Sequence, residues 1–237
     1  MSERSWAGSS PEARPRAAAV VVAGGSGRRL GAAVPKQYLE LLGEPILLRS
    51  VRAFLAHPGI DWTVVVLPAA DAEDPPAWLR RLEVRVVAGG AERGDSVWNG
   101  LQATPPEAEL VLVHDGARPF VPAEVIDRVL AGAAAGGAIA ALPAADTLKE
   151  VGADGVIRAT PERSRLWQAQ TPQGFPRAVL LEAYRRAREA GYAGTDEASL
   201  CERLGVPVRV VPGSPLNLKI THAADLDLAA ALAQRLR

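Results

Sequence analysis

The chain contains little sulfur: among its 237 residues there is one cysteine, Cys201, and one methionine. A single cysteine excludes a disulfide within the chain and any zinc site built from several thiolates. Cys201 stands in a helical-looking run, DEASLCERLG, where the simplest interpretation is a small apolar packing residue.

Neither sign of charge is in excess, because 27 Lys and Arg residues balance 27 Asp and Glu residues. Without a global basic field, sequence-independent binding to DNA or RNA is disfavoured. No run approaches the roughly 20 uninterrupted apolar residues of a membrane span. Residues 1–16 are polar and lack an apolar signal core. We therefore expect a disordered tail over residues 1–16, no nucleic-acid or membrane partner, and a cytoplasmic protein.

Short β-branched runs alternate with helical patterns along the chain. Buried strands are predicted at 17–23, 62–68, 84–90, 110–116, 138–143 and 207–212. Helical spacing of apolar residues is found at 45–59, 96–103, 122–136, 177–191 and 222–237. This alternation is typical of βαβ units, and it predicts an α/β protein with a doubly wound, mostly parallel sheet in one domain over residues 17–237.

One segment, residues 146–160, breaks this alternation. It contains two short extended runs around Ala153-Asp154-Gly155, and an Asp-Gly pair is a hairpin signal. Because the runs read as short and polar, such a hairpin would bury little by itself and should pack on something else. We predict a protruding β-hairpin arm that contacts a second copy of the chain and forms a homodimer.

The stretch AGGSGRRLGAAVPKQ, residues 23–37, follows the first predicted strand, and ligands of open α/β sheets collect at such strand ends. A Walker A loop is excluded, since no Lys-Ser or Lys-Thr pair follows the glycines. A dinucleotide fingerprint fits poorly, since Gly31 comes one place late and no acidic residue ends a second strand. Two interpretations stay open: a tight turn with surface arginines, and a triphosphate site in which Arg29 and Lys36 neutralise the phosphates.

Seven ordered motifs carry a more specific resemblance, from about residue 18 to the C-terminus. The loop is followed by GGAERGDSV (89–97), HDGARPF (114–120), DT (146–147), RSRLWQAQTPQGF (163–175), TDEAS (195–199) and NLKIT (217–221). In this order they resemble the 2-C-methyl-D-erythritol 4-phosphate cytidylyltransferases of the sugar and alditol nucleotidyltransferase superfamily, which act in the non-mevalonate isoprenoid pathway. The resemblance implies a Rossmann-like nucleotidyltransferase fold and transfer of CMP from CTP to methylerythritol phosphate.

The resemblance also implies a nucleotide site. CTP would be bound by Ala23, Gly24, Gly25, Gly27, Gly89, Gly90 and Ser96. Members of the family often have an acidic residue where this chain has Ala91, so base recognition would rest on backbone contacts. Arg29 and Lys36 would stabilise the transition state, with Mg²⁺ or a similar divalent cation bridging the CTP phosphates.

For the phosphorylated polyol that accepts CMP, the resemblance implies a second set of residues. The acceptor pocket would be lined by Asp115, Arg118, Thr147, Thr171 and Thr195, and Arg163 and Lys219 would position the attacking phosphate. Arg163 follows the arm and would serve the neighbouring subunit. By itself, however, Arg163 is also typical of a solvated surface residue, and Lys219 of a lysine that protects an edge strand.

Asp115 follows the predicted strand LVLV, and a carboxylate at such a buried tip is costly unless it meets a ligand, a cation or backbone amides. Contact with a metal or substrate, a helix cap, and a salt bridge with Arg118 are the alternatives for this residue. His114 has no cluster of metal ligands around it in the sequence, and we expect a structural role for it.

Two other functions stay open at this stage. Ribitol-5-phosphate cytidylyltransferases share the loop, the lysine and the TPQ motif, and a non-catalytic nucleotide-binding module could use the same fold. Three cations expected to converge, Arg29, Lys36 and Lys219, favour an enzyme over a module that only binds. RSRLWQAQTPQ and HDGARPF favour the methylerythritol enzymes over the ribitol enzymes.

Overall fold

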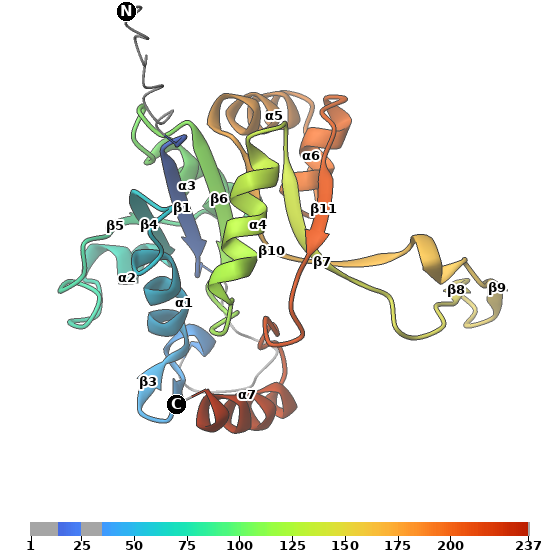
Figure 1. Ribbon diagram of the computed structural model, residues 1–237, viewed down its shortest axis with the longest axis horizontal. Helices are drawn as coiled ribbons and strands as arrows, with labels where there is room; N and C mark the ends of the chain where they lie inside the picture. Colours follow the sequence, from blue (N-terminus) through green and yellow to red (C-terminus); the bar gives the residue numbers. More distant parts are fainter. Residues whose placement is uncertain (1–13, 25–34, 237) are drawn as a thin grey trace, which may run out of the picture.

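The computed structural model describes residues 14–24 and 35–236. A seven-stranded sheet, with the order β11-β7-β10-β6-β1-β4-β5, forms its centre (Figure 1). The strands are β1 (Ala17–Val22), β4 (Trp62–Leu67), β5 (Arg85–Ala88), β6 (Leu110–Asp115), β7 (Ala138–Pro143), β10 (Trp167–Pro176) and β11 (Arg209–Pro212). Neighbouring strands run parallel except where β10 pairs with β6 and β7. The predicted doubly wound, mostly parallel sheet is confirmed.

Helices cover both faces of the sheet, because successive side chains of each strand point to opposite sides. One face is covered by α3 (Arg93–Gln102), α5 (Arg177–Glu189) and α6 (Glu197–Arg203), and the other by α1 (Ile46–Leu55) and α4 (Ala123–Ala133). On β1, Val20 packs with the first group and Val21, the next residue, packs with the second. A strand buried in this way is apolar at every position, which is why continuous apolar runs predicted it.

Besides the apolar cores on the two faces of the sheet, a separate apolar cluster lies below the carboxyl ends of the strands (Figure 1). There α7 (Ala223–Arg235) packs near a small hairpin formed by β2 (Glu40–Leu41) and β3 (Glu44–Pro45). Ile220, fully buried in this cluster, donates its backbone N–H to the carbonyl of Ala117 at 2.9 Å. The cluster therefore ties the chain before α7 to the loop that follows β6.

Strand β10 is the element that the hydrophobic patterns did not predict. Its sequence, WQAQTPQGFP, is rich in polar residues and has Pro172 near its middle, features that argue against an inner strand. The structure accommodates them through a register shift between Ala169 and Gln173 and through side-chain partners. Gln173, for example, donates to the carboxylate of Asp196 at 2.9 Å and accepts the backbone N–H of Ala198 at 3.1 Å.

The arm predicted at 146–160 is a hairpin of β8 (Glu150–Val151) and β9 (Ile157–Ala159) that projects sideways from the sheet (Figure 1). Gly155 in its turn has a positive φ of 77°, which explains the Asp-Gly signal. The expectation that the arm is polar is wrong: Leu148, Val151, Val156 and Ile157 are between 38% and 57% exposed. The arm therefore presents an apolar surface to its surroundings.

The remaining helical elements are short: α2 (Ala69–Glu73) and the 3-10 turns η2 (Lys36–Tyr38) and η3 (Arg163–Arg165). The predicted helices at 45–59, 96–103, 122–136, 177–191 and 222–237 correspond to α1, α3, α4, α5 and α7. Within the described part of the chain, no helix has both the length and the apolar character needed to cross a membrane.

Candidate active site

A cavity of about 490 Å³ opens at the carboxyl ends of β1 and β6. It is lined by residues 22–24, 36–37, 90–93 and 115–117, together with Ser96 and Lys219. These segments are distant in the sequence but meet here because β1 and β6 are adjacent and parallel, with Val22 opposite Asp115. This is the place at which open α/β sheets bind ligands.

One wall of the cavity is held together by Ser96. Its hydroxyl accepts the backbone N–H of Gly90 at 3.1 Å and donates to the carbonyl of Glu92 at 3.1 Å. A Cβ added to Gly24 or Gly89 would lie only 3.0 or 2.7 Å from the Ser96 Oγ. The structure therefore brings Gly24, Gly89, Gly90 and Ser96 together and keeps this wall free of large side chains.

Lys36 stands at the start of η2 and lines the cavity, and its Nζ donates to the carbonyl of Ile220 at 3.4 Å. Ala23 lies on the same lining, at the end of β1. Gly25, Gly27 and Arg29, the other predicted residues of this loop, lie outside the described residues.

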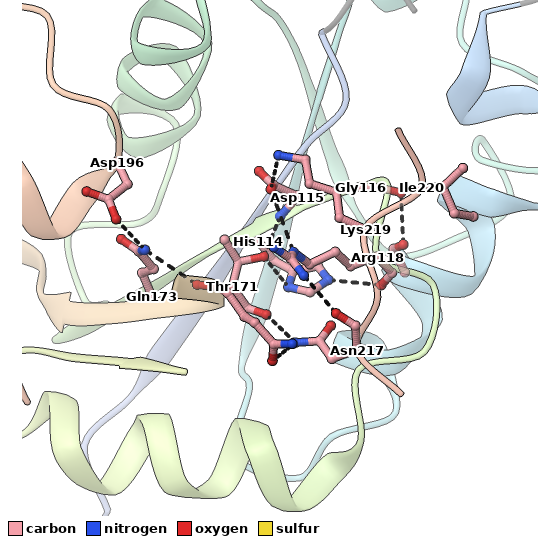
Figure 2. A network of polar contacts seen from close by, with 12 residues as sticks. His114, Asp115, Gly116, Arg118, Thr171, Gln173, Asp196, Asn217, Lys219 and Ile220 are labelled. Carbon is pink, nitrogen blue, oxygen red and sulfur yellow. Dashed lines mark hydrogen bonds and ion pairs between the residues drawn. The ribbon is translucent and has the colours of Figure 1, made fainter. Parts of the chain in front are cut away.

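The carboxylate of Asp115 is surrounded by cations at the base of the cavity (Figure 2). Its Oδ2 lies 2.7 Å from Lys219 Nζ and 3.8 Å from Arg118 Nε, and its Oδ1 lies 3.2 Å from Arg93 Nε. Burial alone would raise the pKa of Asp115, but Arg93 and Lys219 outweigh it and hold that pKa far below its ordinary value. Asp115 is therefore ionised although it is only 8% exposed.

Arg93 is itself held by a second, fully buried carboxylate. Its two terminal nitrogens lie 2.8 and 3.1 Å from the two oxygens of Glu197, which also accepts the hydroxyl of Tyr184 at 3.0 Å. The sequence interpretation did not assign a role to either Arg93 or Glu197. The sequence did place each of them inside a motif that carries the resemblance: Arg93 in GGAERGDSV and Glu197 in TDEAS.

His114 connects Asp115 to strand β10 through hydrogen bonds of fixed direction (Figure 2). Its Nε2 lies 3.1 Å from the carbonyl of Arg118 and must donate, so its Nδ1 accepts the hydroxyl of Thr171 at 3.0 Å. The Thr171 oxygen in turn accepts the backbone N–H of Asp115 at 3.0 Å. Burial lowers the pKa of His114 to about 4, so this ring is neutral at pH 7, in keeping with a structural role.

The segment that carries Lys219 is fixed by Asn217, which is fully buried. Its side-chain nitrogen donates to the backbone carbonyl of Thr171 at 2.7 Å. Its backbone carbonyl accepts a hydrogen bond from Arg118 Nη1 at 2.7 Å. Arg118 is 8% exposed and does not line the cavity. In this structure both Arg118 and Thr171 serve the buried network below the cavity, although the sequence placed them in the acceptor pocket.

The other predicted acceptor residues lie further away. Thr195 lines a smaller hollow of about 110 Å³, which shares Arg93 with the main cavity. Thr147 on the arm and Arg163 in η3, just after the arm, are both exposed, and Arg163 donates to the carbonyl of Ala145 at 2.8 Å. Neither residue lines the cavity of its own chain.

The described residues do not fit a resident metal ion. Among them no group of three or more His, Cys, Asp and Glu residues could hold one. Both oxygens of Asp115, the expected ligand, already face cationic nitrogens. A divalent cation at this site would depend on ligands that the substrate brings.

Fold and site together define a class: a nucleotidyltransferase, in which a glycine-lined wall and Lys36, Arg93 and Lys219 face one cavity at the strand ends. A comparison with protein families refines this class. The model of the family "IspD: 2-C-methyl-D-erythritol 4-phosphate cytidylyltransferase" matches residues 17–235. The chain therefore belongs to the 2-C-methyl-D-erythritol 4-phosphate cytidylyltransferase family, and the resemblance inferred from the motifs is confirmed.

Individual members of the family are similar to this chain over most of their length. The chain is 49% identical to the 2-C-methyl-D-erythritol 4-phosphate cytidylyltransferase of Symbiobacterium thermophilum, covering 89% of each chain. It is 46% identical to the enzyme of that name from Syntrophus aciditrophicus, covering 94% of this chain and 97% of the relative. The crystal structure of the Thermus thermophilus enzyme superposes with a TM-score of 0.79 at 36% identity, covering 93% of this chain and 99% of that one.

The buried, neutral His114 predicts a pH dependence of stability. Its folded pKa of about 4 is below the ordinary value of 6.5, so the unfolded chain binds a proton that the folded chain does not. The free energy of unfolding should be highest above pH 6.5 and fall as the pH drops toward 4. The share of His114 is at most about 3.5 kcal/mol, at about 1.4 kcal/mol per pKa unit.

Urea unfolding at several pH values between 7.5 and 4.5 measures this fall. His114→Gln should lower stability at pH 7.5 and flatten the pH dependence. A slope that His114→Gln does not change would contradict the assignment.

Proposed function

We propose that this protein transfers CMP from CTP to 2-C-methyl-D-erythritol 4-phosphate, releasing pyrophosphate and forming 4-diphosphocytidyl-2-C-methyl-D-erythritol. The observation that carries the proposal, beside family membership, is the cavity that joins a wall of small residues to Lys36, Arg93 and Lys219. The small residues leave room for the base and ribose, Lys36 matches the triphosphate, and Lys219 faces the acceptor phosphate. The comparisons do not favour a ribitol phosphate enzyme or a non-catalytic module.

The proposed chemistry needs no protein nucleophile. An oxygen of the acceptor phosphate attacks the α-phosphorus of CTP in line, the bond to the bridging oxygen breaks, and pyrophosphate leaves with the electron pair. Lys36, which lines the cavity, neutralises the charge that develops, together with Arg29. Lys219 and Arg163 position the acceptor phosphate. We expect Mg²⁺ or a similar divalent cation to arrive on the CTP phosphates, because the described residues offer it no resident site.

We also propose that the active form is a homodimer in the cytoplasm. The arm exposes Leu148, Val151, Val156 and Ile157, and a two-stranded hairpin has little stability of its own. Packing these side chains on a second copy would remove apolar surface from water, which is favourable by roughly 25 cal/mol per Å². The same contact would bring Arg163 and Thr147 to the cavity of the neighbouring chain, since they do not line their own.

Pyrophosphate release tests the proposed reaction directly. CTP, UTP, ATP and GTP are each supplied with a divalent cation and with methylerythritol phosphate or ribitol phosphate as acceptor. We expect CTP with methylerythritol phosphate to be fastest, and UTP to have a kcat/KM lower by at least about fivefold, since an unpaired buried group costs about 1–3 kcal/mol. Equal values for CTP and UTP would overturn the base site, and a preference for ribitol phosphate would overturn the proposed acceptor.

The shared site can be tested by complementation between two inactive variants. Lys36→Ala should reduce kcat by at least about 100-fold, the scale seen when one charge partner of a transition state is removed, and Arg163→Ala should also inactivate the homodimer. In a mixed dimer one site carries both changes and the other carries neither. Random mixing should therefore restore about a quarter of wild-type activity, because about half of the dimers would hold one intact site.

Two results would contradict this arrangement. If mixed dimers form and recover no activity, Arg163 acts within its own chain. If the protein sediments as a monomer while fully active, the arm does not complete the site. Combining two preparations that both carry Lys36→Ala is the matched control, which should recover nothing.

A further inference from the structure

We propose that Glu197 is a positioning residue: by occupying both terminal nitrogens of Arg93, it leaves the Asp115 carboxylate available to hold Lys219 at the cavity. The inference deepens the proposed function and rests on it. It assigns a role in catalysis to a buried carboxylate that does not line the cavity.

The geometry forms a chain of alternating charge from α6 to the cavity. Glu197 takes the two terminal nitrogens of Arg93 at 2.8 and 3.1 Å, which leaves only Arg93 Nε for Asp115 Oδ1 at 3.2 Å. The other oxygen of Asp115 is then open to Lys219 Nζ at 2.7 Å. Arg93 and Lys219 both line the cavity, so this chain ends on groups that face the substrate.

Without the negative charge of Glu197, Arg93 would have one carboxylate within reach. An arginine prefers to bind a carboxylate with two parallel N–H groups, so its terminal nitrogens would turn toward both oxygens of Asp115. Lys219 would then lose its partner and its position. Glu197 therefore prevents Arg93 from competing with Lys219 for the same carboxylate.

The helix that carries Glu197 does not need this residue for its own start. Its N-cap is Asp196, whose side chain accepts the Ser199 N–H at 3.0 Å in a capping box. The buried ion pair of Arg93 and Glu197 also adds little to the stability of the fold, since desolvation of the two charges offsets most of their attraction. The position of the carboxylate is thus explained by what it does to Arg93.

The first test is Glu197→Gln, which keeps the shape of the side chain but places an amide N–H₂ against one terminal nitrogen of Arg93. For the folded variant we expect kcat/KM for the acceptor to fall by at least about tenfold, the scale of a lost charge-assisted hydrogen bond. The Kd of CTP, measured by calorimetry without acceptor, should change by less than about twofold, because the wall formed around Ser96 is untouched. The control is Glu202→Gln, on the exposed side of the same helix, which should leave both quantities unchanged.

The decisive measurement is a double-variant cycle. If the damage comes from the released nitrogens of Arg93, then Glu197→Gln should lower kcat/KM by less than about twofold in a chain that already carries Arg93→Gln. A role that does not act through Arg93 predicts that Glu197→Gln causes its full loss in that background as well. Should Glu197→Gln yield no folded protein, Glu197→Asp retains the charge but reaches one nitrogen of Arg93, and the same loss and the same non-additivity are expected.

The outcomes separate this inference from the proposed function. A wild-type protein without CTP-dependent pyrophosphate release would overturn the proposed function itself. An active wild type with a Glu197→Gln variant of normal kcat and KM would overturn only the role of Glu197. A full loss from Glu197→Gln in the Arg93→Gln background would overturn it as well.

Discussion

The carboxylate of Asp115 is buried at the end of β6, and its charge has to be balanced inside the protein. Three parts of the chain contribute to that balance: Arg93 reaches the carboxylate from α3, Lys219 from the segment before α7, and Arg118 from the following loop. Thr171 of β10 holds the same residue by accepting its backbone N–H. The carboxyl end of β6, α3 and the C-terminal segment are thereby fixed relative to one another around a single charge.

This arrangement also places positive charge where a phosphate-transfer reaction would use it. Lys219 and Arg93 are held on the cavity by Asp115 and Glu197, so their positions are set before any substrate binds. Cations that are already in position need little reorganisation energy during the reaction, and such groups account for much of the electrostatic stabilisation in catalysis. Both oxygens of Asp115 already face cationic nitrogens.

Strands could be predicted from the sequence where burial on both faces requires apolar residues. They could be predicted less well where polar contacts hold the strand in place. The two-sided burial of β1, β4 and β6 leaves continuous apolar runs, whereas β10 hides its polar residues in specific hydrogen bonds that no periodicity reveals. For the site, the glycine wall and Lys219 could be predicted from motifs. The partnership of Arg93 with Glu197 joins residues 104 positions apart and depends on the packing of α6 on α5, so no local pattern indicates it.

The charge state of Asp115 tests this account most directly. The side-chain carboxyl carbon of Asp115 can be assigned by comparison with Asp115→Asn and followed by ¹³C NMR from pH 7 down to the onset of unfolding. The account predicts that its chemical shift stays constant across the range in which ordinary aspartates titrate, because Arg93 and Lys219 keep the carboxylate ionised. A titration midpoint at or above about 4, the ordinary value for aspartate, would contradict it.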